Sequence, residues 1–348
     1  MMRVPGRLYA KPGGMTMKIA LDAMGGDNAP IAEVGGAVAA CRDLGISVIL
    51  VGDPALIEAE TAKYPEARSL GLEIVAATER ITMDEHPAAA VKHKRQSSIV
   101  IANELVRNGQ ADGVVSAGNT GAAMAASLLR LGRIKGIDRP AIGFPVPTAK
   151  GVTVLLDMGA NADCDAENLV QFAMMGAVYA ERVLSITNPR IGLLNIGTEP
   201  TKGNSLALSA YPLLSDSGLN FIGNVEGNDL PQGAADVIVC DGFIGNVVLK
   251  FAEGLSSMLF TQIKETVAAT LKGKIGGLLL QSSLRSIRKR LDYAEYGGAP
   301  LLGVNGVSII AHGRSNARAI ANAIKAAAKA SDEKVVEAIC QALSNKAR

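Results

Sequence analysis

Short aliphatic runs alternate with longer helical patterns along most of this chain, and this alternation most constrains its fold. The runs are nearly continuous in Val, Ile and Leu, which is typical of strands covered on both faces. Strands that alternate with helices predict an α/β fold, a mostly parallel sheet in a three-layer αβα arrangement. The predicted strands are Lys18–Asp22, Ser47–Gly52, Leu72–Ala76, Gly113–Ser116, Val152–Asp157, Arg190–Asn195, Val237–Cys240 and Val307–Ala311. The clearest predicted helices are Ser97–Asn108, Thr120–Leu131, Ala166–Leu184, Gly245–Leu259 and Arg314–Ala330.

The chain has 348 residues, enough for one large α/β domain or two smaller ones. No low-complexity linker and no convincing internal repeat divides it, so we favour a single domain over residues 17–345. Residues 1–16 precede the first predicted strand and are expected to be a disordered extension. Between residues 255 and 296 helical patterns replace the strand rhythm. We expect this excursion to form a dimer interface or a surface for a partner or a membrane.

The composition excludes several classes of function. The formal net charge is only +2, Trp is absent and aromatic residues make up 3% of the chain. Neither the basic excess nor the stacking residues of a nucleic-acid-binding domain are therefore present. The four cysteines include no C-x-x-C pair, which favours a reducing, cytoplasmic location. Because no uncharged apolar stretch is long enough to span a membrane, membrane contact is expected to be peripheral.

Polar segments rich in Gly and Asn follow strand after strand. Because parallel strands end at the same edge of a sheet, these segments are expected to converge on one ligand crevice. Backbone N–H groups and Asn, Ser and Thr side chains at close range suit a small oxyanion such as phosphate. The segments are Asp22–Pro30, Ser116–Gly121, Asp157–Asn161, Asn195–Asn204, Gly223–Asp229 and Asp241–Asn246. The candidate binding residues are Asp22, Gly25, Gly26, Asp27, Ser116, Gly118, Asn119, Thr120, Asp157, Asn161, Asn224, Asp241 and His312.

Each of these signals also has a purely structural interpretation. Segment Ser116–Gly121 opens a predicted helix and would offer N–H groups to phosphate, but the same residues would also suit a plain N-cap turn. Lys202, the one cation within the polar segments, would clamp an anion, although most loop lysines are simply solvated. His312 has the chemistry of a general base and also that of an ordinary structural histidine. The residues alone leave these alternatives open.

Several well-known motifs are absent. The first predicted strand is followed by Asp22-Ala-Met-Gly-Gly-Asp27, which lacks the G-x-G-x-x-G spacing of dinucleotide-binding proteins. There is no Walker G-x-x-x-x-G-K-[ST] sequence, no G-x-S-x-G elbow and no histidine pair at H-E-x-x-H spacing. We therefore expect neither a cofactor nor a metal ion.

Seven ordered segments of the chain resemble phosphate acyltransferases of the PlsX type, over about residues 17–330. They begin at Met17 (MKIALDAMGGDNAP), Ala111 (ADGVVSAGNTGAAM), Leu155 (LLDMGANADC), Gly192 (GLLNIGTEPTKGN), Phe221 (FIGNVEGND), Val237 (VIVCDGFIGNVVLK) and Glu295 (EYGGAPLLGVNGVSIIAHGRSN). The resemblance implies a fold related to phosphotransacetylases and to isocitrate-type dehydrogenases. Residues before Met17 lie outside this pattern.

The resemblance also implies an activity: transfer of a fatty acyl group from acyl-acyl carrier protein to inorganic phosphate. The acyl phosphate product would serve acylation of glycerol 3-phosphate in phospholipid synthesis, by a membrane-bound acyltransferase. By position, Lys202 and Asn246 match the family's catalytic pair, Lys202 to hold phosphate and Asn246 to orient the reacting groups. A homodimer is implied as well. Two rival functions stay open, a short-chain phosphotransacetylase that uses coenzyme A and a non-catalytic anion-binding protein.

The stretch Leu271–Leu291 has the pattern of a basic amphipathic helix. The apolar residues at helical spacing are Leu280, Leu284, Ile287 and Leu291. The basic residues are Arg285, Arg288, Lys289 and Arg290. Such a helix can lie in an anionic membrane interface, pack its apolar stripe on a dimer partner, or receive an acidic carrier protein. The pattern is compatible with all three.

Overall fold

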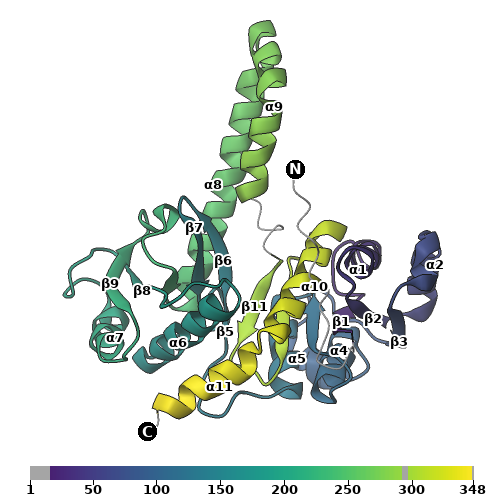
Figure 1. Cartoon of the computed structure of the whole chain (residues 1–348), viewed down its shortest axis with the longest axis horizontal. Helices are drawn as coiled ribbons and strands as arrows, with labels where there is room; N and C mark the ends of the chain where they lie inside the picture. The colour runs from purple at the N-terminus through teal and green to yellow at the C-terminus, as the bar shows by residue number, and fades with distance from the viewer. Residues whose placement is uncertain (1–15, 292–296, 347–348) are drawn as a thin grey trace.

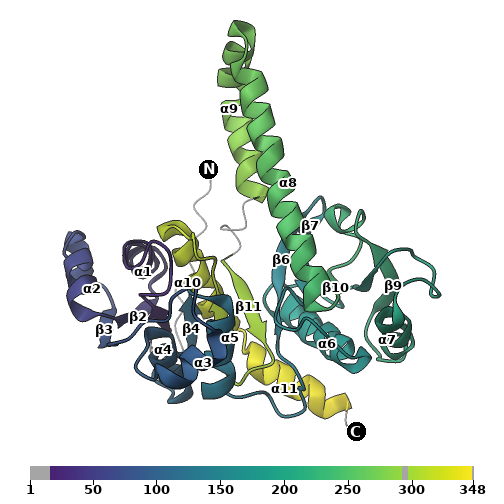
Figure 2. The same ribbon diagram turned by 180° about the vertical axis from the view of Figure 1, so that it is seen from behind.

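The computed structural model describes residues 16–291 and 297–346 of the chain (Figure 1). Within these residues the strands form two β-sheets flanked by helices, and a long helical pair projects away from both (Figures 1 and 2). The α/β class with mostly parallel strands is confirmed. The predicted N-terminal extension lies outside the described residues except for Thr16.

The larger sheet has seven strands in the order β3-β2-β1-β4-β12-β11-β5. Five of them run parallel, whereas β11 pairs antiparallel with both β12 and β5. The strands are β1 (Lys18–Asp22), β2 (Ser47–Gly52), β3 (Leu72–Ala76), β4 (Gly113–Ser116), β5 (Ala141–Ile142), β11 (Ala299–Leu302) and β12 (Val307–Ile310). The helical segments that accompany them are α1 (Ile31–Leu44), α2 (Pro54–Thr61), the 3-10 turn Pro65–Ser69, α3 (Pro87–His93), α4 (Ser98–Arg107), α5 (Thr120–Arg130) and α10 (Ala317–Asp332).

Side chains that alternate along a strand of this sheet pack against helices on opposite faces. Ile19 and Leu21 of β1 share a core with residues of α1 and α10, whereas Ala20 between them packs with residues of α3, α4 and α5. This is the period-two alternation of a strand buried on both sides. The predicted three-layer arrangement is therefore present around the larger sheet.

The smaller sheet has five strands in the order β6-β7-β10-β8-β9, parallel except for β6 at its edge. They are β6 (Phe144–Thr148), β7 (Gly151–Leu156), β8 (Ile191–Asn195), β9 (Phe221–Glu226) and β10 (Val237–Val239). One face packs on α6 (Ala166–Arg182), α7 (Ser205–Ser215) and α11 (Val335–Lys346). A second core contains residues of both sheets, among them Ala20 and Leu155. The two sheets therefore share one hydrophobic core.

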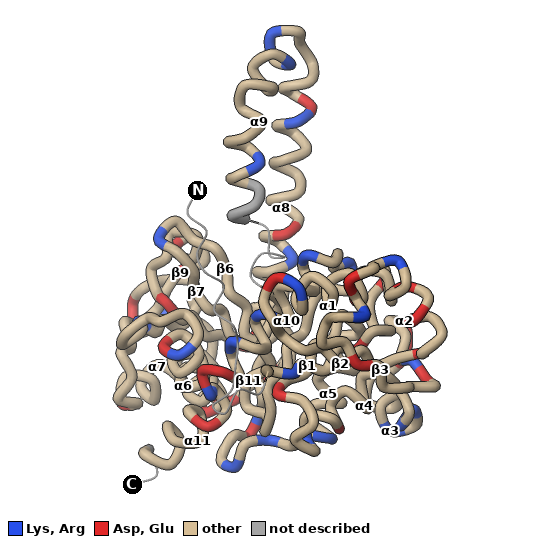
Figure 3. Tube along the Cα trace, turned by 45° about the vertical axis from the view of Figure 1, so that its right-hand side comes forward, with Lys and Arg blue, Asp and Glu red and all other residues tan. Residues whose placement is uncertain are grey.

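The projecting pair consists of α8 (Gly242–Ala268) and α9 (Leu271–Leu291), which pack on each other as a hairpin (Figures 1 and 2). The predicted excursion falls on this hairpin, although α8 begins earlier than predicted, directly after β10. Lys and Arg residues lie at the tip of the hairpin and part-way down α9 (Figure 3). The predicted amphipathic helix is present with the bounds Leu271–Leu291, and residues 292–296 lie outside the described part.

The strands that the sequence failed to predict are β5, β6, β9 and β11. Strand β6 contains Pro145 and Pro147, which cannot donate ladder hydrogen bonds and are tolerated because β6 is an edge strand. In β9 the residues Gly223-Asn224 are typical of a turn. This segment is extended because β9 pairs with β8. Tertiary pairing therefore overrides local propensity at these positions.

Candidate functional site

Asp22 and Ser116 join the carboxyl ends of the neighbouring strands β1 and β4. The Ser116 hydroxyl donates to Asp22 Oδ2 at 2.7 Å and accepts from the Gly118 N–H at 3.1 Å. Both side chains are buried, and burial raises the pKa of the Asp22 carboxyl despite the hydrogen bonds that oppose the shift. The pair therefore organises the loops around it.

Three loops of the larger sheet meet at this edge. A Cβ atom on Gly25 would lie 2.9 Å from Gly118 Cα, so the loops after β1 and β4 touch backbone to backbone. The Asp27 N–H donates to the Gly313 carbonyl oxygen at 2.9 Å, which adds the loop after β12. The loops after β1, β4 and β12 therefore lie together, whereas the other four predicted polar segments belong to strands of the smaller sheet.

Helix α5 begins at the loop after β4. Asn119 is its N-cap, since Asn119 Oδ1 accepts from the Ala122 N–H at 3.1 Å, and Asn119 Nδ2 donates to the Met83 carbonyl oxygen at 2.9 Å. The first helical residue, Thr120, is exposed. The capping role weighed for this segment is therefore present, and the Thr120 side chain faces solvent at the helix N-terminus.

Asp157 organises the corresponding edge of the smaller sheet. Its carboxylate accepts from the N–H groups of Ile142, Ala160 and Asn161 at 3.0, 3.1 and 2.7 Å, and from Asn161 Nδ2 at 2.9 Å. Asn161 Nδ2 also donates to the Pro140 carbonyl oxygen at 2.8 Å. Asp157 is wholly buried, and burial raises its pKa. Asp157 and Asn161 thus fix a loop from within, with few atoms left for a ligand.

The first turns of α8 sit directly on this loop. Asp241 caps the helix by accepting from the Ile244 N–H at 2.8 Å, and the Gly242 N–H donates to the Asn161 carbonyl oxygen at 2.7 Å. Gly245 faces the Asp157 carbonyl oxygen so closely that no side chain fits. This close packing places Asn246 at the surface of the loop, next to Gly159, with an exposed side chain.

The loop after β8 carries Lys202 and is held by two asparagines. Asn195 Nδ2 donates to the Lys202 carbonyl oxygen at 3.0 Å. The Glu199 carbonyl oxygen accepts both from the Lys202 N–H at 3.1 Å and from Asn224 Nδ2 at 2.8 Å. Lys202 is exposed, and within the described residues its ammonium group has no hydrogen bond or ion pair. The Lys202 backbone is therefore held in place, and its exposed ammonium group is accessible to an anion.

His312, in the loop after β12 of the larger sheet, feels the charges of two residues of α8. Its Nδ1 accepts from the Arg314 N–H at 3.1 Å, so the neutral ring carries its proton on Nε2. Partial burial lowers its pKa, while the charge of Glu253 opposes and that of Lys250 adds to this shift. Since Lys250 and Glu253 belong to α8, the loop after β12 faces the base of the hairpin. The Nδ1 lone pair is occupied by the Arg314 N–H, which disfavours His312 as a general base.

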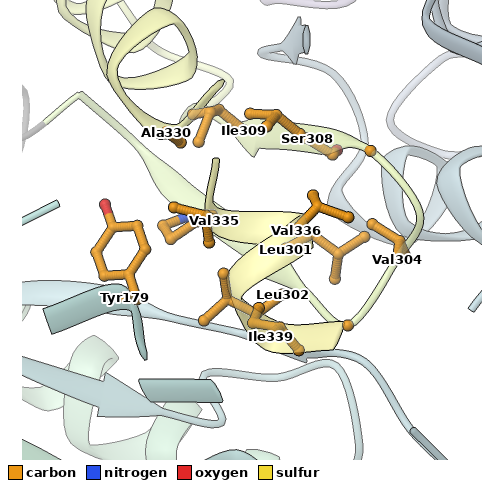
Figure 4. A pocket seen from close by; sticks show the side chains of 14 residues that line it. Tyr179, Leu301, Leu302, Val304, Ser308, Ile309, Ala330, Val335, Val336 and Ile339 are labelled. Atoms are coloured by element: carbon orange, nitrogen blue, oxygen red, sulfur yellow. The ribbon is translucent and has the colours of Figure 1, made fainter. Parts of the chain in front are cut away.

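A small cavity lies elsewhere, between β11, β12 and α11 (Figure 4). Its labelled lining residues are Tyr179, Leu301, Leu302, Val304, Ser308, Ile309, Ala330, Val335, Val336 and Ile339. Burial raises the pKa of the Tyr179 hydroxyl, which stays protonated at neutral pH. This cavity is an apolar packing space. No group of three His, Cys, Asp or Glu side chains in the described ranges could hold a metal ion.

Comparison with known proteins identifies the family. A family model described as "Fatty acid synthesis protein" matches residues 17–338. A phosphate acyltransferase of Desulfitobacterium hafniense (strain DSM 10664 / DCB-2) is 57% identical over 324 residues, which cover 93% of this chain and 96% of the relative. The chain belongs to the phosphate acyltransferase family. A second phosphate acyltransferase, from Heliobacterium modesticaldum (strain ATCC 51547 / Ice1), is 54% identical over 330 residues, 95% of this chain and 98% of its own. The predicted acyltransferase class is confirmed.

Solved structures place this phosphate acyltransferase family member in a known fold. A phosphotransacetylase from Streptococcus pyogenes aligns with a TM-score of 0.60 at 19% identity, covering 92% of this chain and 94% of the neighbour. A 4-hydroxythreonine-4-phosphate dehydrogenase from Klebsiella pneumoniae aligns with a TM-score of 0.52 at 12% identity, covering 90% and 98%. At such identities the likeness concerns the fold alone. The predicted relation to phosphotransacetylases and dehydrogenases is confirmed at that level.

The structure sorts the predicted site residues of this acyltransferase into two groups by sheet. Those at the larger sheet are Asp22, Gly25, Gly26, Asp27, Ser116, Gly118, Asn119, Thr120 and His312. Those at the smaller sheet are Asp157, Asn161, Lys202, Asn224, Asp241 and Asn246. Sequence reasoning missed Asn195, which holds Lys202, although its place as the last residue of β8 was a usable signal.

Proposed function

We propose that this acyltransferase transfers a fatty acyl group from acyl-acyl carrier protein to inorganic phosphate, and that the acyl phosphate serves glycerol-3-phosphate acylation in phospholipid synthesis. The supporting observation is the placement of Lys202 and Asn246 after the adjacent parallel strands β8 and β10. Both side chains are exposed at the same edge. The Lys202 backbone is held by hydrogen bonds with Asn195 and Glu199, and Asn246 follows the tightly packed Gly245.

The proposed acyl transfer depends more on positioning the phosphate and the thioester than on activating either of them. A phosphate oxygen lone pair attacks the thioester carbonyl carbon, the C–S bond breaks, and the carrier leaves as a thiolate that is then protonated by solvent. Lys202 offsets the charge of the phosphate, and Asn246 donates toward the developing oxyanion. The N-terminus of α5 supplies further N–H donors for phosphate. A prearranged polar site of this kind gains most of its rate from orientation and electrostatics.

The decisive experiment measures phosphate-dependent formation of acyl phosphate from palmitoyl-acyl carrier protein. Lys202→Ala and Asn246→Ala should each lower kcat about 100-fold or more, the range for removing one prearranged donor. Lys150→Ala is the matched control, because Lys150 is also an exposed loop lysine and lies in the turn between β6 and β7. Near-normal turnover by both Lys202→Ala and Asn246→Ala would refute the assignment.

The nearest rival function is that of a phosphotransacetylase that uses coenzyme A. The Streptococcus pyogenes neighbour, which shares the fold, is named a phosphotransacetylase. Donor choice separates the two functions. Turnover of palmitoyl carrier protein without turnover of acetyl-coenzyme A supports the proposal, and the reverse supports the rival. Phosphate binding without transfer from either donor would indicate a non-catalytic binding protein.

The hairpin is the proposed surface for partners, with the protein cytoplasmic and peripheral at an anionic membrane. On α9, Leu271 is 77% exposed and Leu279 79%, and basic residues lie on the same helix. By length and composition α8 would also pass as a spanning helix, with a mean hydropathy of 1.3. Flotation with anionic vesicles tests the membrane contact, and sedimentation tests the homodimer. A Leu279→Glu variant that floats like wild type would argue against the membrane contact.

The same helix is a proposed docking surface for the acidic carrier protein. Arg285 lies on the described part of α9, with Lys272 and Lys274 nearer the tip. Opposite charges raise the rate of encounter and are screened by salt. Arg285→Glu should therefore raise KM for the carrier substrate with little change in kcat, and the effect should shrink at high salt. An unchanged KM at low salt would count against this docking surface.

A further inference from the structure

Glu33 is a buried acid in the first turn of α1 that the chemistry described above does not use. Only 1% of the residue is exposed, and its Oε2 has no hydrogen-bond partner within the described residues. Its Oε1 lies so close to Gly26, in the loop after β1, that no Cβ atom would fit on this glycine. Burying a carboxyl group in this way is costly, and an apolar side chain of similar size would serve packing as well.

Two more carboxyl groups lie close to Glu33, because the charges of Asp22 and Asp27 act on it from the same loop. Asp22 is buried and Asp27 is exposed. Basic groups act on these two aspartates: Arg80 acts on Asp22, and His312 interacts with Asp27. The side chains that pack nearby from other segments carry no formal charge, and they are Ala117, Tyr64, Ala317 and Ile320. Three acids therefore meet at one loop.

This loop is one of the three that meet at the carboxyl edge of the larger sheet, where Gly25 packs against Gly118. Burial raises the pKa of Glu33 to about 7, the charges of Asp22 and Asp27 add to the rise, and backbone N–H groups oppose it. Glu33 therefore changes charge near neutral pH, in a place where water screens the charge poorly. An anion at this edge would be repelled by ionised Glu33 but not by neutral Glu33.

We propose that Glu33 is a positioning residue of the phosphate site: its neutral form allows the loop after β1 to face phosphate, and its carboxylate form weakens phosphate binding. The inference rests on the proposed acyl transfer to phosphate, because that function brings an anion to this edge. The proton is exchanged with solvent and takes no part in the transfer. By linkage, bound phosphate favours protonated Glu33, so phosphate binding takes up protons.

The test compares the KM for phosphate of wild type and Glu33→Gln from about pH 5.5 to about pH 8.5, with palmitoyl-acyl carrier protein as the donor. The ratio of the two KM values at each pH cancels the ionisation of phosphate itself. The ratio of wild type to variant should be near one at the acid end. It should rise about three- to tenfold at the alkaline end, the effect of one partly screened charge about 10 Å from an anion.

The kcat at saturating phosphate separates this effect from a loss of folded protein. Ionised Glu33 acts on phosphate binding, so the kcat of folded wild type should change little relative to that of Glu33→Gln. Partial unfolding of wild type at high pH would lower the apparent kcat and leave KM unchanged. A rise in KM with pH is therefore a result that a merely structural role of Glu33 would not produce.

Glu60→Gln is the matched control. Glu60 is another buried glutamate, 6% exposed, but it lies in α2 and pairs with Lys63 at 2.6 Å. The ratio of the wild-type KM to that of Glu60→Gln should not change with pH. A measurement that needs no turnover is calorimetry of phosphate binding in two buffers with different heats of ionisation. Near neutral pH, wild type should take up more protons per phosphate than Glu33→Gln.

Three results would overturn the proposal. One is a wild-type to Glu33→Gln ratio of KM that stays constant with pH, and another is the same pH dependence with Glu60→Gln. The third is equal proton uptake by wild type and Glu33→Gln. If Glu33→Gln fails to fold, Glu33→Met, which has a similar length and no charge, gives the same comparisons. Absence of acyl phosphate formation by wild type would instead refute the proposed function, and calorimetry would still test Glu33.

Discussion

Asn195 holds the backbone of Lys202, since Asn195 Nδ2 donates to the Lys202 carbonyl oxygen at 3.0 Å. Asn195→Ala removes this hold and leaves the ammonium group intact. We expect kcat to fall about tenfold or more, because small displacements of a positioned group are costly. Asn220→Ala is the matched control, since Asn220 Nδ2 also donates to a carbonyl oxygen, that of Asn188, at 3.0 Å, but at the opposite edge of the sheet. Equal kcat values for the two variants would contradict a positioning role.

Gly245 and Gly254 offer a paired test within α8. A methyl group at Gly245 would collide with the Asp157 carbonyl oxygen, whereas nothing lies within 4 Å of one at Gly254. Gly245→Ala should therefore displace the first turns of α8, lower the free energy of unfolding by about 2 kcal/mol and reduce acyl transfer. Gly254→Ala should keep activity and gain up to about 1 kcal/mol from helix propensity. Urea unfolding and kcat for both variants give the comparison, and a neutral Gly245→Ala would be inconsistent with the packing described.

Asp157 should matter for stability before it matters for chemistry. Asp157→Ala leaves the N–H donors of Ile142, Ala160 and Asn161 without their acceptor, and the Ile142 and Asn161 groups are buried. The expected loss in the free energy of unfolding is about 3–5 kcal/mol. Asp84→Ala, at an exposed position, should change it by no more than about 0.5 kcal/mol. Denaturant titration measures both, and a similar small loss for the two would show that the buried network is dispensable.

Because the pKa of buried Glu33 is raised, we expect the free energy of unfolding to fall as pH rises. Its side chain is buried in the first turn of α1 with Oε2 unpaired, and burial raises its pKa from 4.5 to about 7, with the charges of Asp22 and Asp27 adding to the shift. Between these pH values the folded chain keeps a proton that the unfolded chain has lost. Stability contributed by neutral Glu33 is therefore complete below pH 4.5 and is lost by about pH 7, a change of about 3 kcal/mol.

Glu33→Gln isolates this contribution. The variant cannot ionise, so the difference in unfolding free energy between wild type and variant should grow with pH across that window, to the disadvantage of wild type. Urea unfolding at several pH values measures the difference. A difference that does not change with pH would mean that Glu33 titrates alike in the folded and unfolded chain.

The sequence by itself determined the strand core and the family. The strands β1, β2, β3 and β4 have the predicted bounds because each is a short aliphatic run between clear turn signals. The helix Leu271–Leu291 is also present as predicted, since its apolar spacing is local information. Motifs such as GLLNIGTEPTKGN are contiguous, so the family could be identified without any coordinates.

Only the tertiary structure decided how these pieces combine. The division into two sheets depends on which strands pair, and β6 and β9 become extended only through their neighbours. Asp22 and Ser116 are far apart in the chain, and their hydrogen bond exists because β1 lies beside β4. Likewise, only close packing of α8 on the Asp157 loop directs Asn246 outward. The propensity of a segment for helix or strand depends on its own residues. Long-range contacts depend on which segments pair, and this cannot be predicted from any single segment.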